Sequence, residues 1–297
     1  MAASPHRVVV IGSGGRLGAA VARQLRQSGH AVIAFDRKGL DLSRPEIIDD
    51  RLQPLAFDSV VLTAALTGLD DAERRPDAAC AINAGGPERV AAIAHRRGAR
   101  LIHVSTDYVY AGEKAGLRTE SDPTGPLSVY GKSKLEGERR VLAASDGQAL
   151  VLRTSWVFGP DRPAFPDMIV GQARKSDRVS AIADKFSSPT SALDAAQWIE
   201  SLLDRREVAG VLNFCNDGAC SWQEYGQKAL DLAAEAGIPL KARQVGALKL
   251  ADMAGFIAQR PVHTAMDVEK LAHTLGFRPR PWQEALRAYI GRYYGRD

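Results

Sequence analysis

The stretch Val8-Val9-Val10-Ile11-Gly12-Ser13-Gly14-Gly15-Arg16-Leu17-Gly18 decides the fold of this chain. Its four β-branched residues predict a short buried strand, and a helical pattern follows over Gly15–Ser28. Glycine spacing of the form G-x-x-G-x-x-G lets the strand turn sharply, lets the backbone approach a phosphate and lets the helix pack closely. The helix N-terminus then presents unpaired N–H groups to an anion. The pattern therefore predicts that Gly12, Gly15 and Gly18 form a pyrophosphate-binding loop.

The same alternation of apolar strand and amphipathic helix continues to about residue 160. We predict strands at Arg7–Ile11, Ala31–Phe35, Ser59–Thr63, Arg100–Ser105 and Ala149–Ser155, and helices at Gly15–Ser28, Pro76–Arg97 and Val129–Ala144. Apolar strands separated by helices indicate an α/β fold with a doubly wound Rossmann parallel sheet. In such sheets ligands bind at the carboxyl ends of the strands.

The pattern changes after Gly159, where Pro160, Pro163 and Pro166 interrupt regular structure. We predict a dinucleotide-binding domain over residues 1–160 and a smaller C-terminal substrate domain over residues 161–297. Residues 192–216 are expected to return to the sheet as a helix and a strand, at Ala192–Leu203 and Val211–Phe214. Two further helices are predicted at Ser221–Ala236 and Trp282–Tyr294.

Composition excludes several classes of partner. The chain has 297 residues and a net charge of +4, and its lysines and arginines are scattered, so we expect no nucleic-acid partner. No apolar run is long enough to span a bilayer and the N-terminus lacks a signal-peptide pattern, so we expect a cytoplasmic protein without a membrane partner. The spacing of Cys80, Cys215 and Cys220 predicts neither a disulfide framework nor a metal site.

The end of the second predicted strand bears on the choice of cofactor. Asp36 can accept a hydrogen bond from a ribose 2′-hydroxyl, which favours NADH. Arg37 and Lys38 follow and could bind a 2′-phosphate, which favours NADPH, or could simply be solvated loop cations. Both cofactors, NADPH and NADH, therefore stay open.

A tyrosine and a lysine stand four residues apart in Tyr130-Gly131-Lys132-Ser133-Lys134. On a helix these two side chains share a face. A free phenol has a pKa near 10, and we expect the Lys134 ammonium, together with the positive nicotinamide of an oxidised cofactor, to lower it. Tyr130 could then donate a proton to a carbonyl oxygen. Alone the pattern also fits a surface pair, but its position after a phosphate loop favours catalysis.

A hydroxyl residue follows the predicted strand Arg100–Ser105. Thr106 stands at the carboxyl end of that strand, the edge that faces ligands in this fold. We expect it to hold the substrate oxygen beside Tyr130. The alternative is an ordinary strand-end cap.

Taken together, these motifs resemble the extended short-chain dehydrogenases and, more narrowly, the dTDP-4-dehydrorhamnose reductase (RmlD-like) group. Matching stretches run through nearly the whole chain. They are Gly12–Gly18, Ala64–Glu73, Asn83, Ser105–Tyr110, Pro126–Glu138, Arg153–Gly159, Ser188–Thr190, Arg260-Pro261 and Pro281-Trp282.

The resemblance implies a role for individual residues. Tyr130, Lys134 and Thr106 would be the catalytic set. The cofactor would be bound at the pyrophosphate by Gly15, Arg16 and Leu17, at the ribose by Asp36, at the adenine by Asp41 and Leu42, and from beneath by Ala64, Ala65 and Leu66. Thr106, Asp107 and Trp156 would contact a nucleoside-diphosphate sugar, although Trp156 fits domain-boundary core equally well. Dimers are common on this fold, so a homodimer is among the expectations.

The chain departs from the group's pattern in its substrate half. Leu66 stands where the group usually has an aromatic residue or His, and Arg162–Pro166 lacks the usual Asn-Phe pair. Lys185 follows Asp184 where the group usually has Gln. The cofactor half is intact, so these departures bear on which sugar is bound more than on the reaction.

The resemblance implies NAD(P)H-dependent reduction of a 4-keto-6-deoxy sugar nucleotide. One alternative is a sugar-nucleotide epimerase or dehydratase on the same fold, for which an acidic residue after the Thr, here Asp107, is usual. Another is a non-catalytic, cofactor-binding regulatory subunit, since the regulatory subunit of methionine adenosyltransferase resembles the same group. Intact Thr106, Tyr130 and Lys134 favour an enzyme.

Overall fold

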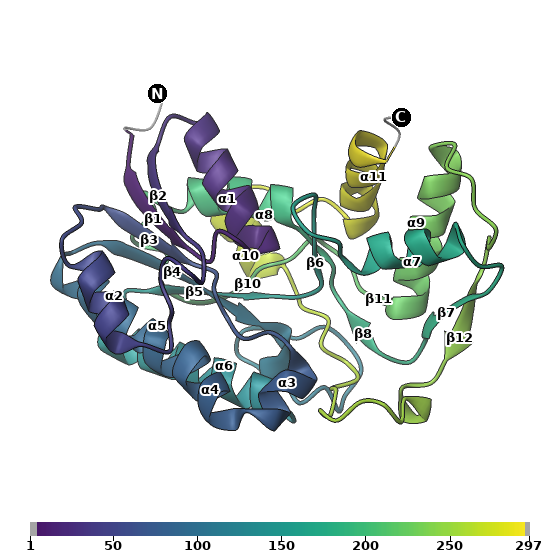
Figure 1. The fold of residues 1–297 in the computed structure, drawn as a ribbon, viewed down its shortest axis with the longest axis horizontal. Helices are drawn as coiled ribbons and strands as arrows, with labels where there is room; N and C mark the ends of the chain where they lie inside the picture. Colours follow the sequence, from purple (N-terminus) through teal and green to yellow (C-terminus); the bar gives the residue numbers. More distant parts are fainter. Residues whose placement is uncertain (1–4, 295–297) are drawn as a thin grey trace.

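The computed structural model describes residues 5–294, and a six-stranded parallel sheet dominates it (Figure 1). The strand order is β10-β5-β4-β3-β1-β2, with every neighbouring pair parallel. Their bounds are β1 Arg7–Ile11, β2 Ala31–Phe35, β3 Ser59–Leu62, β4 Arg100–Thr106, β5 Leu150–Thr154 and β10 Gly210–Asn213. The direction of chain progression reverses between β1 and β3, which is the switch point where ligands bind in doubly wound sheets. The predicted fold class is confirmed.

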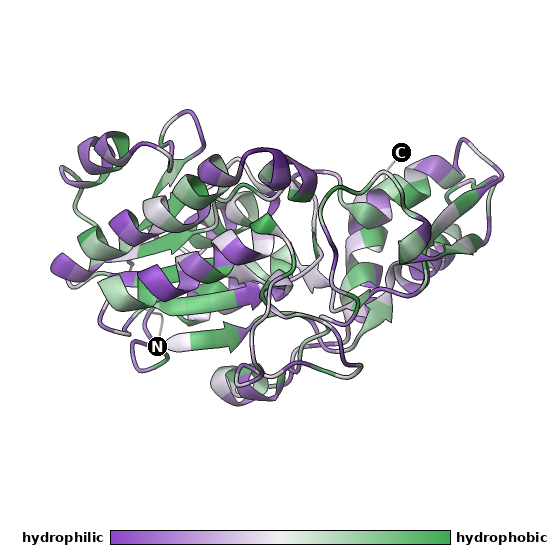
Figure 2. Ribbon diagram, turned by 90° about the horizontal axis from the view of Figure 1, so that it is seen from below, coloured by the Kyte–Doolittle hydropathy of each residue, from purple (hydrophilic) through white to green (hydrophobic). Residues whose placement is uncertain are grey.

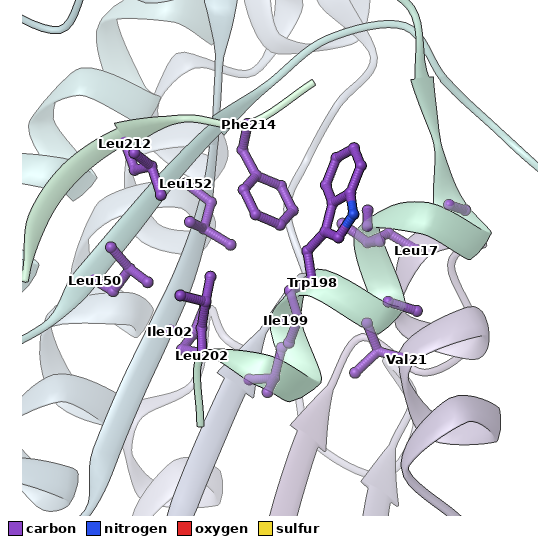
Figure 3. Close-up of a cluster of buried hydrophobic side chains, with 14 of the residues drawn as sticks. Leu17, Val21, Ile102, Leu150, Leu152, Trp198, Ile199, Leu202, Leu212 and Phe214 are labelled. Atoms are coloured by element: carbon purple, nitrogen blue, oxygen red, sulfur yellow. The ribbon is translucent and has the colours of Figure 1, made fainter. Parts of the chain in front are cut away.

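Helices cover both faces of this sheet (Figure 1). On one face α1 (Arg16–Gln27) packs against α8 (Ala192–Ser201). On the other lie α2 (Pro45–Leu52), α5 (Gly86–Arg96) and α6 (Val129–Ala144). The core under α1 and α8 is close-packed, with Trp198 meeting Phe214 edge-on at a centroid distance of 5.4 Å (Figure 3). The helix α8, from the second half of the chain, therefore completes the cover of this face of the sheet beside α1.

A smaller lobe lies at one end of the sheet (Figure 1). It contains the helices α7 (Phe165–Ala173), α9 (Trp222–Glu235) and α11 (Trp282–Tyr293), and the short parallel pair β7 (Val179–Ile182) and β12 (Val245–Leu248). The short pairs β6 (Val157–Phe158) with β9 (Thr190–Ser191) and β8 (Phe186–Ser187) with β11 (Cys220–Ser221) also lie in the second half of the chain.

Two later segments return to the first lobe. Residues 192–213 supply α8 and the edge strand β10, which pairs with β5. α10 (Glu269–Leu275) contacts β10, and Met266, Val268 and Leu271 join the core beneath α1. We propose the division into a dinucleotide-binding domain and a substrate domain on this basis, with residues 266–275 returned to the former.

The expected helix Pro76–Arg97 is helical without interruption over residues 76–96 in the structure, with a π-helical turn inside it. It divides into α4 (Pro76–Cys80), a π-helical turn at Ala81–Gly85, and α5, and a separate short helix, α3 (Leu69–Arg74), precedes it. At the π-helical turn, the main chain of Asn83 meets α6 so closely that a Cβ on Gly137 would lie 2.0 Å from the Asn83 carbonyl oxygen. The contact with α6 therefore lies at the π-helical turn. The spacing of apolar residues in the sequence does not indicate such a turn.

Four α-helices within residues 5–294 were not predicted, namely α2, α3, α7 and α10. Two of them, α2 and α7, share one sequence signal. In both a proline occupies the first turn, where its missing N–H would have no intrahelical partner anyway. Pro166 therefore helps to start α7 rather than interrupting regular structure, and the interpretation of it as a breaker is wrong. Pro45 at the start of α2 was an equally usable signal.

Hydropathy follows this layering (Figure 2). The central strands are mostly hydrophobic, while the helices are hydrophobic on some positions and hydrophilic on others, as expected for helices with one face on a core. Across residues 5–294, no helix combines the length and apolar character that crossing a membrane requires.

Candidate active site

The loop between β1 and α1 is built for close backbone approach. Gly12 has φ +102°, and a Cβ there would lie 2.6 Å from the Ala64 nitrogen. A Cβ on Gly18 would lie 2.2 Å from the Gly12 carbonyl oxygen. Gly15 is the N-cap of α1 and no side chain caps that helix, so its first N–H groups remain for an anion. These features fit a dinucleotide pyrophosphate at the loop.

Two other residues of the loop contribute differently. The Arg16 guanidinium donates to the carbonyl oxygens of Val157 (2.9 Å) and Arg162 (3.1 Å), and also to that of Pro163. Leu17 is 7% exposed and belongs to the core under α1. Their backbone N–H groups, rather than their side chains, are therefore the parts that could meet a pyrophosphate. Arg16 also ties the loop to the segment that enters the smaller lobe.

The residues that bear on the adenosine end lie after β2. Asp36 is exposed and its Oδ1 accepts from the Gly39 N–H at 2.9 Å, which leaves the second oxygen for a ribose. Arg37 is also exposed. Asp41 accepts from the N–H (2.9 Å) and hydroxyl (2.7 Å) of Ser43, and Leu42 is buried.

Asn83 links the third strand to the catalytic helix. Its side chain accepts from the Leu66 N–H at 2.8 Å and donates to the Leu66 carbonyl at 3.1 Å. It also donates to the Ser133 hydroxyl on α6 at 3.0 Å. The segment Ala64-Ala65-Leu66 is thereby fixed relative to α6. Sequence reasoning matched Asn83 to the family but gave it no role, because the contact depends on the π-helical turn.

Tyr130 and Lys134 lie one turn apart on α6, whose first turn is capped by Ser128. Lys134 is 1% exposed, and its Nζ donates to the Val104 carbonyl at 2.7 Å and lies 3.5 Å from Nε2 of His103. Burial lowers the pKa of Lys134 to about 8, and the Glu138 carboxylate opposes this. Burial and the lysine charge hold the pKa of His103 well below its ordinary value, so this imidazole is neutral.

The expectation that Lys134 and the nicotinamide of an oxidised cofactor together make the phenol more acidic stays a prediction, and among the chain's own groups Lys134 does not contribute to the pKa of Tyr130. Burial raises the pKa of Tyr130 to about 12, against an opposing hydrogen-bonding interaction with the Thr106 side chain. The ammonium is engaged with the Val104 carbonyl instead. Tyr130 is consequently a protonated phenol at neutral pH, which suits a proton donor.

Thr106 and Asp107, at the end of β4, belong to one buried cluster of hydrogen bonds. The Thr106 hydroxyl donates to Oδ1 of Asp107 at 3.1 Å, and Oδ2 accepts from Ser187 at 2.8 Å and from Thr264. Asp107 is 1% exposed, and desolvation raises its pKa while nearby Lys185 and the three hydroxyls lower it. Both carboxylate oxygens of Asp107 are therefore engaged by hydroxyl groups of the chain itself.

Trp156 adopts a left-handed backbone conformation, with φ +41°. For a non-glycine residue this conformation is strained, and strain of this kind concentrates at functional sites. Its ring stacks on Tyr225 (centroids 6.0 Å apart, 10° between planes) and lies 5.6 Å from the ring of Trp222. The residue is half-buried, so both interpretations, sugar contact and packing, persist as proposals.

Known proteins with similar sequences belong to one family. The family described as RmlD substrate binding domain matches residues 6–294. The dTDP-4-dehydrorhamnose reductase of Aggregatibacter actinomycetemcomitans is 31% identical over 287 residues, covering 95% of this chain and 97% of the relative. The spore coat polysaccharide biosynthesis protein SpsK of Bacillus subtilis is also 31% identical, covering 96% of each chain.

Solved structures are similar over the same length. A dTDP-4-dehydrorhamnose reductase from Clostridium acetobutylicum superposes with a TM-score of 0.88 at 30% identity, covering 96% of this chain and 98% of that one. One from Bacillus anthracis in complex with NADP has a TM-score of 0.88 at 27% identity, covering 97% and 99%.

The parallel sheet, the glycine loop and the Tyr130–Lys134 pair define a member of the extended short-chain dehydrogenase/reductase class. Within that class, the chain belongs to the RmlD family.

Proposed function

We propose that this chain is an NAD(P)H-dependent oxidoreductase that reduces the 4-keto group of a 6-deoxy sugar nucleotide, as its dTDP-4-dehydrorhamnose reductase relatives are named for doing. The observation that carries the proposal is the set Thr106, Tyr130 and Lys134, of which Thr106 and Lys134 are buried and Tyr130 is half-buried, in the same fold as the glycine loop of the parallel sheet. A dTDP-sugar is the expected substrate class, and NADPH the expected cofactor, since a relative binds NADP.

Bound reduced nicotinamide would supply the hydride to the keto carbon. Tyr130 would protonate the resulting oxyanion, because its pKa of about 12 keeps the phenol protonated at neutral pH. Lys134 would hold the nicotinamide ribose with the ammonium that now donates to the Val104 carbonyl. The buried Glu138 carboxylate raises the pKa of this lysine and so favours its charged form.

The sugar nucleotide would meet the residues at the ends of β4 and β5. We propose that Thr106 lies beside the keto oxygen and that Trp156 offers its ring to the sugar face. Asp107 would act from behind, through Thr106. A homodimer in the cytoplasm, without a nucleic-acid or membrane partner, completes the proposal.

Tyr130→Phe tests the reaction and the assignment of the acid together. NADPH oxidation is followed spectrophotometrically with a dTDP-4-keto-6-deoxyhexose, and the variant should lose roughly 10²- to 10⁴-fold in kcat because a positioned acid contributes that much. Its Kd for NADPH should stay near that of the wild type.

The outcomes separate the alternatives. Turnover of the variant at the wild-type rate would contradict the role of Tyr130. Conversion of the sugar nucleotide without net NADPH consumption would indicate an epimerase or dehydratase. NADPH binding without turnover of any keto-sugar nucleotide, with a stoichiometric partner protein, would indicate a regulatory subunit.

A further inference from the structure

Arg16, the first residue of α1, reaches the segment that leads into the smaller lobe. Its guanidinium donates to the carbonyl oxygens of Val157 (2.9 Å), Arg162 (3.1 Å) and Pro163. All three acceptors lie within residues 157–163, here called the linker segment. One side chain of the glycine loop therefore holds the main chain of the linker segment at both of its ends.

A second arginine of α1 holds the middle of the linker segment. Arg23 donates to both carboxylate oxygens of Asp161, at 2.5 and 3.0 Å, and the two side chains are 38% and 19% exposed. A bidentate contact of this kind fixes orientation as well as distance. Arg16 and Arg23 are about two helical turns apart and lie on one face of α1. That face is therefore bound to the linker segment along its length.

The linker segment is closely packed as well as hydrogen-bonded. Gly159 is buried, and a Cβ there would lie 2.9 Å from Cβ of Ala192 at the start of α8 and 3.7 Å from Cγ of Arg16. Trp156, whose backbone has φ +41°, directly precedes Val157. The placement of Trp156 therefore depends on the contact between α1 and the linker segment.

The charge of Arg16 connects this contact to the cofactor site. The hydrogen-bond acceptors of its guanidinium are neutral carbonyl groups. Arg16 also stands in the first turn of α1, where a pyrophosphate would bind. Coulomb attraction weakens with distance and with screening by water, so a pyrophosphate would favour a guanidinium held on the linker segment over one that has turned into solvent. The anion and the linker contact should therefore stabilise each other.

We propose that Arg16 is a positioning residue that couples cofactor binding to substrate binding: a pyrophosphate at the glycine loop strengthens the contact of α1 with the linker segment and so fixes Trp156 for the sugar nucleotide. The inference rests on the proposed function for the identity of the two ligands. Arg16 transfers no proton in this role. Coupling of this kind is reciprocal, so loosening the linker segment must weaken cofactor binding.

Hydrogen–deuterium exchange of the full-length chain at saturating NADP⁺ tests the coupling without a substrate. In the wild type, NADP⁺ should slow exchange in the glycine loop and, by about 5-fold or more, in residues 157–162, since coupling between sites typically reaches that factor. In Arg16→Met the loop should still be protected and residues 157–162 should not. Arg16→Lys, which keeps the cation but has a single donor group, should restore part of the protection.

Variants further along α1 separate coupling from direct contact with the pyrophosphate. Arg23→Met and Asp161→Asn remove the same ion pair, so each should weaken NADP⁺ binding a few-fold in calorimetry, as expected of a partly exposed pair. The double variant should bind no more weakly than the weaker single variant. Arg26→Met, at an exposed arginine of the same helix, is the control and should match the wild type. An unchanged NADP⁺ affinity in both single variants would overturn the coupling.

Kinetics with the proposed substrate give a separate readout. At saturating NADPH, Arg16→Met should raise KM for the sugar nucleotide and leave kcat nearly unchanged, because Tyr130 and Lys134 stand on α6. A fall in kcat with an unchanged KM would contradict the positioning role. A wild-type chain that reduces no keto sugar overturns the proposed function alone. Exchange in residues 157–162 that does not respond to NADP⁺ in the wild type, or responds equally in Arg16→Met, overturns the inference, whatever the turnover.

Discussion

On the cofactor side of the site, Tyr130, Lys134 and Glu138 follow one another at single-turn intervals on α6. On the substrate side, Asp107 is held by Ser187 and Thr264, which stand 80 and 157 residues further along the chain. The spacing of Tyr130, Lys134 and Glu138 is established as soon as the helix α6 forms. The hydrogen bonds to Asp107 form only when segments from the second half of the chain pack against the end of β4. Substitutions on the cofactor side should therefore change the free energy of unfolding of the whole fold. Substitutions on the substrate side should change only how firmly the later segments pack locally.

Beneath the catalytic helix, the cofactor side has a buried ion pair. Arg153 on β5 donates to both oxygens of Glu138, at 3.0 and 2.7 Å, and their side chains are 5% and 3% exposed. The Ser105 hydroxyl also donates to Glu138, and Arg153 donates to the Tyr110 hydroxyl. The pair joins β4, β5 and α6 into one unit below Lys134.

Arg153→Met should give the largest effect on stability. It leaves a buried carboxylate without its cation, which costs about 3–5 kcal/mol. The free energy of unfolding in urea measures this loss. The matched control is Arg140→Met, which removes an arginine whose pairs with Glu88 and Glu136 are partly exposed, and it should cost at most about 1 kcal/mol. Equal losses in the two variants would contradict the claim that burial makes the Arg153–Glu138 pair the more important of these ion pairs for the cofactor side.

The same contrast explains what could be predicted from the sequence. β1 and β2 were predicted with the bounds that the structure has. The β-branched run of β1 is buried, whereas β2 is an apolar edge strand whose residues are exposed or half-buried. The glycine loop and the pair Tyr130 and Lys134 were predicted from spacing, since a helix of known register fixes which side chains are neighbours. The proline-initiated helix α7 was missed by treating Pro166 as a breaker, although a proline also begins the predicted helix at Pro76.

Other features had no local signal. Nothing near Lys185 in the sequence indicates that its ammonium meets Tyr108 and the Pro261 carbonyl. The direction of the pKa change at Tyr130 was likewise inaccessible, because it depends on how deeply α6 packs and on where the Lys134 ammonium points. Contacts between distant segments and the desolvation they cause are properties of the closed fold.

Lys134→Met should increase stability while abolishing the proposed activity. The pKa of this lysine falls from its ordinary value of 10.5 to about 8, a cost of roughly 3 kcal/mol at 1.36 kcal/mol per pKa unit. Loss of the hydrogen bond to Val104 offsets about 1 kcal/mol, so a net gain of about 1–2 kcal/mol is expected.

The pH dependence of that gain gives a sharper test. Because the folded pKa is the lower one, the unfolded chain binds the proton more readily, and the full cost is present below pH 8. It declines between pH 8 and 10.5 and is absent above. The difference between variant and wild type in urea unfolding should therefore shrink as pH rises over this range. A difference independent of pH would show that the charge of Lys134 is not its source.

The smallest effect is expected on the substrate side, at Asp70. Its Oδ1 accepts from the Ala258 N–H at 2.9 Å and from the Ile257 N–H at 3.2 Å, and Arg260 is paired with the same carboxylate at 3.3 Å. These contacts hold the segment before Pro261, whose carbonyl in turn accepts from Lys185. Asp70→Asn removes the charge and should weaken this closure by about 1 kcal/mol.

The effect of Asp70→Asn should be local. Limited proteolysis should cut faster within residues 249–258, and KM for the sugar nucleotide should rise a few-fold, while urea unfolding of the whole chain shifts little. The reason is that local opening of a segment with few buried apolar contacts does not require global unfolding. A loss of global stability as large as that of Arg153→Met would mean that the substrate side is as integral to the fold as the ion pair under α6.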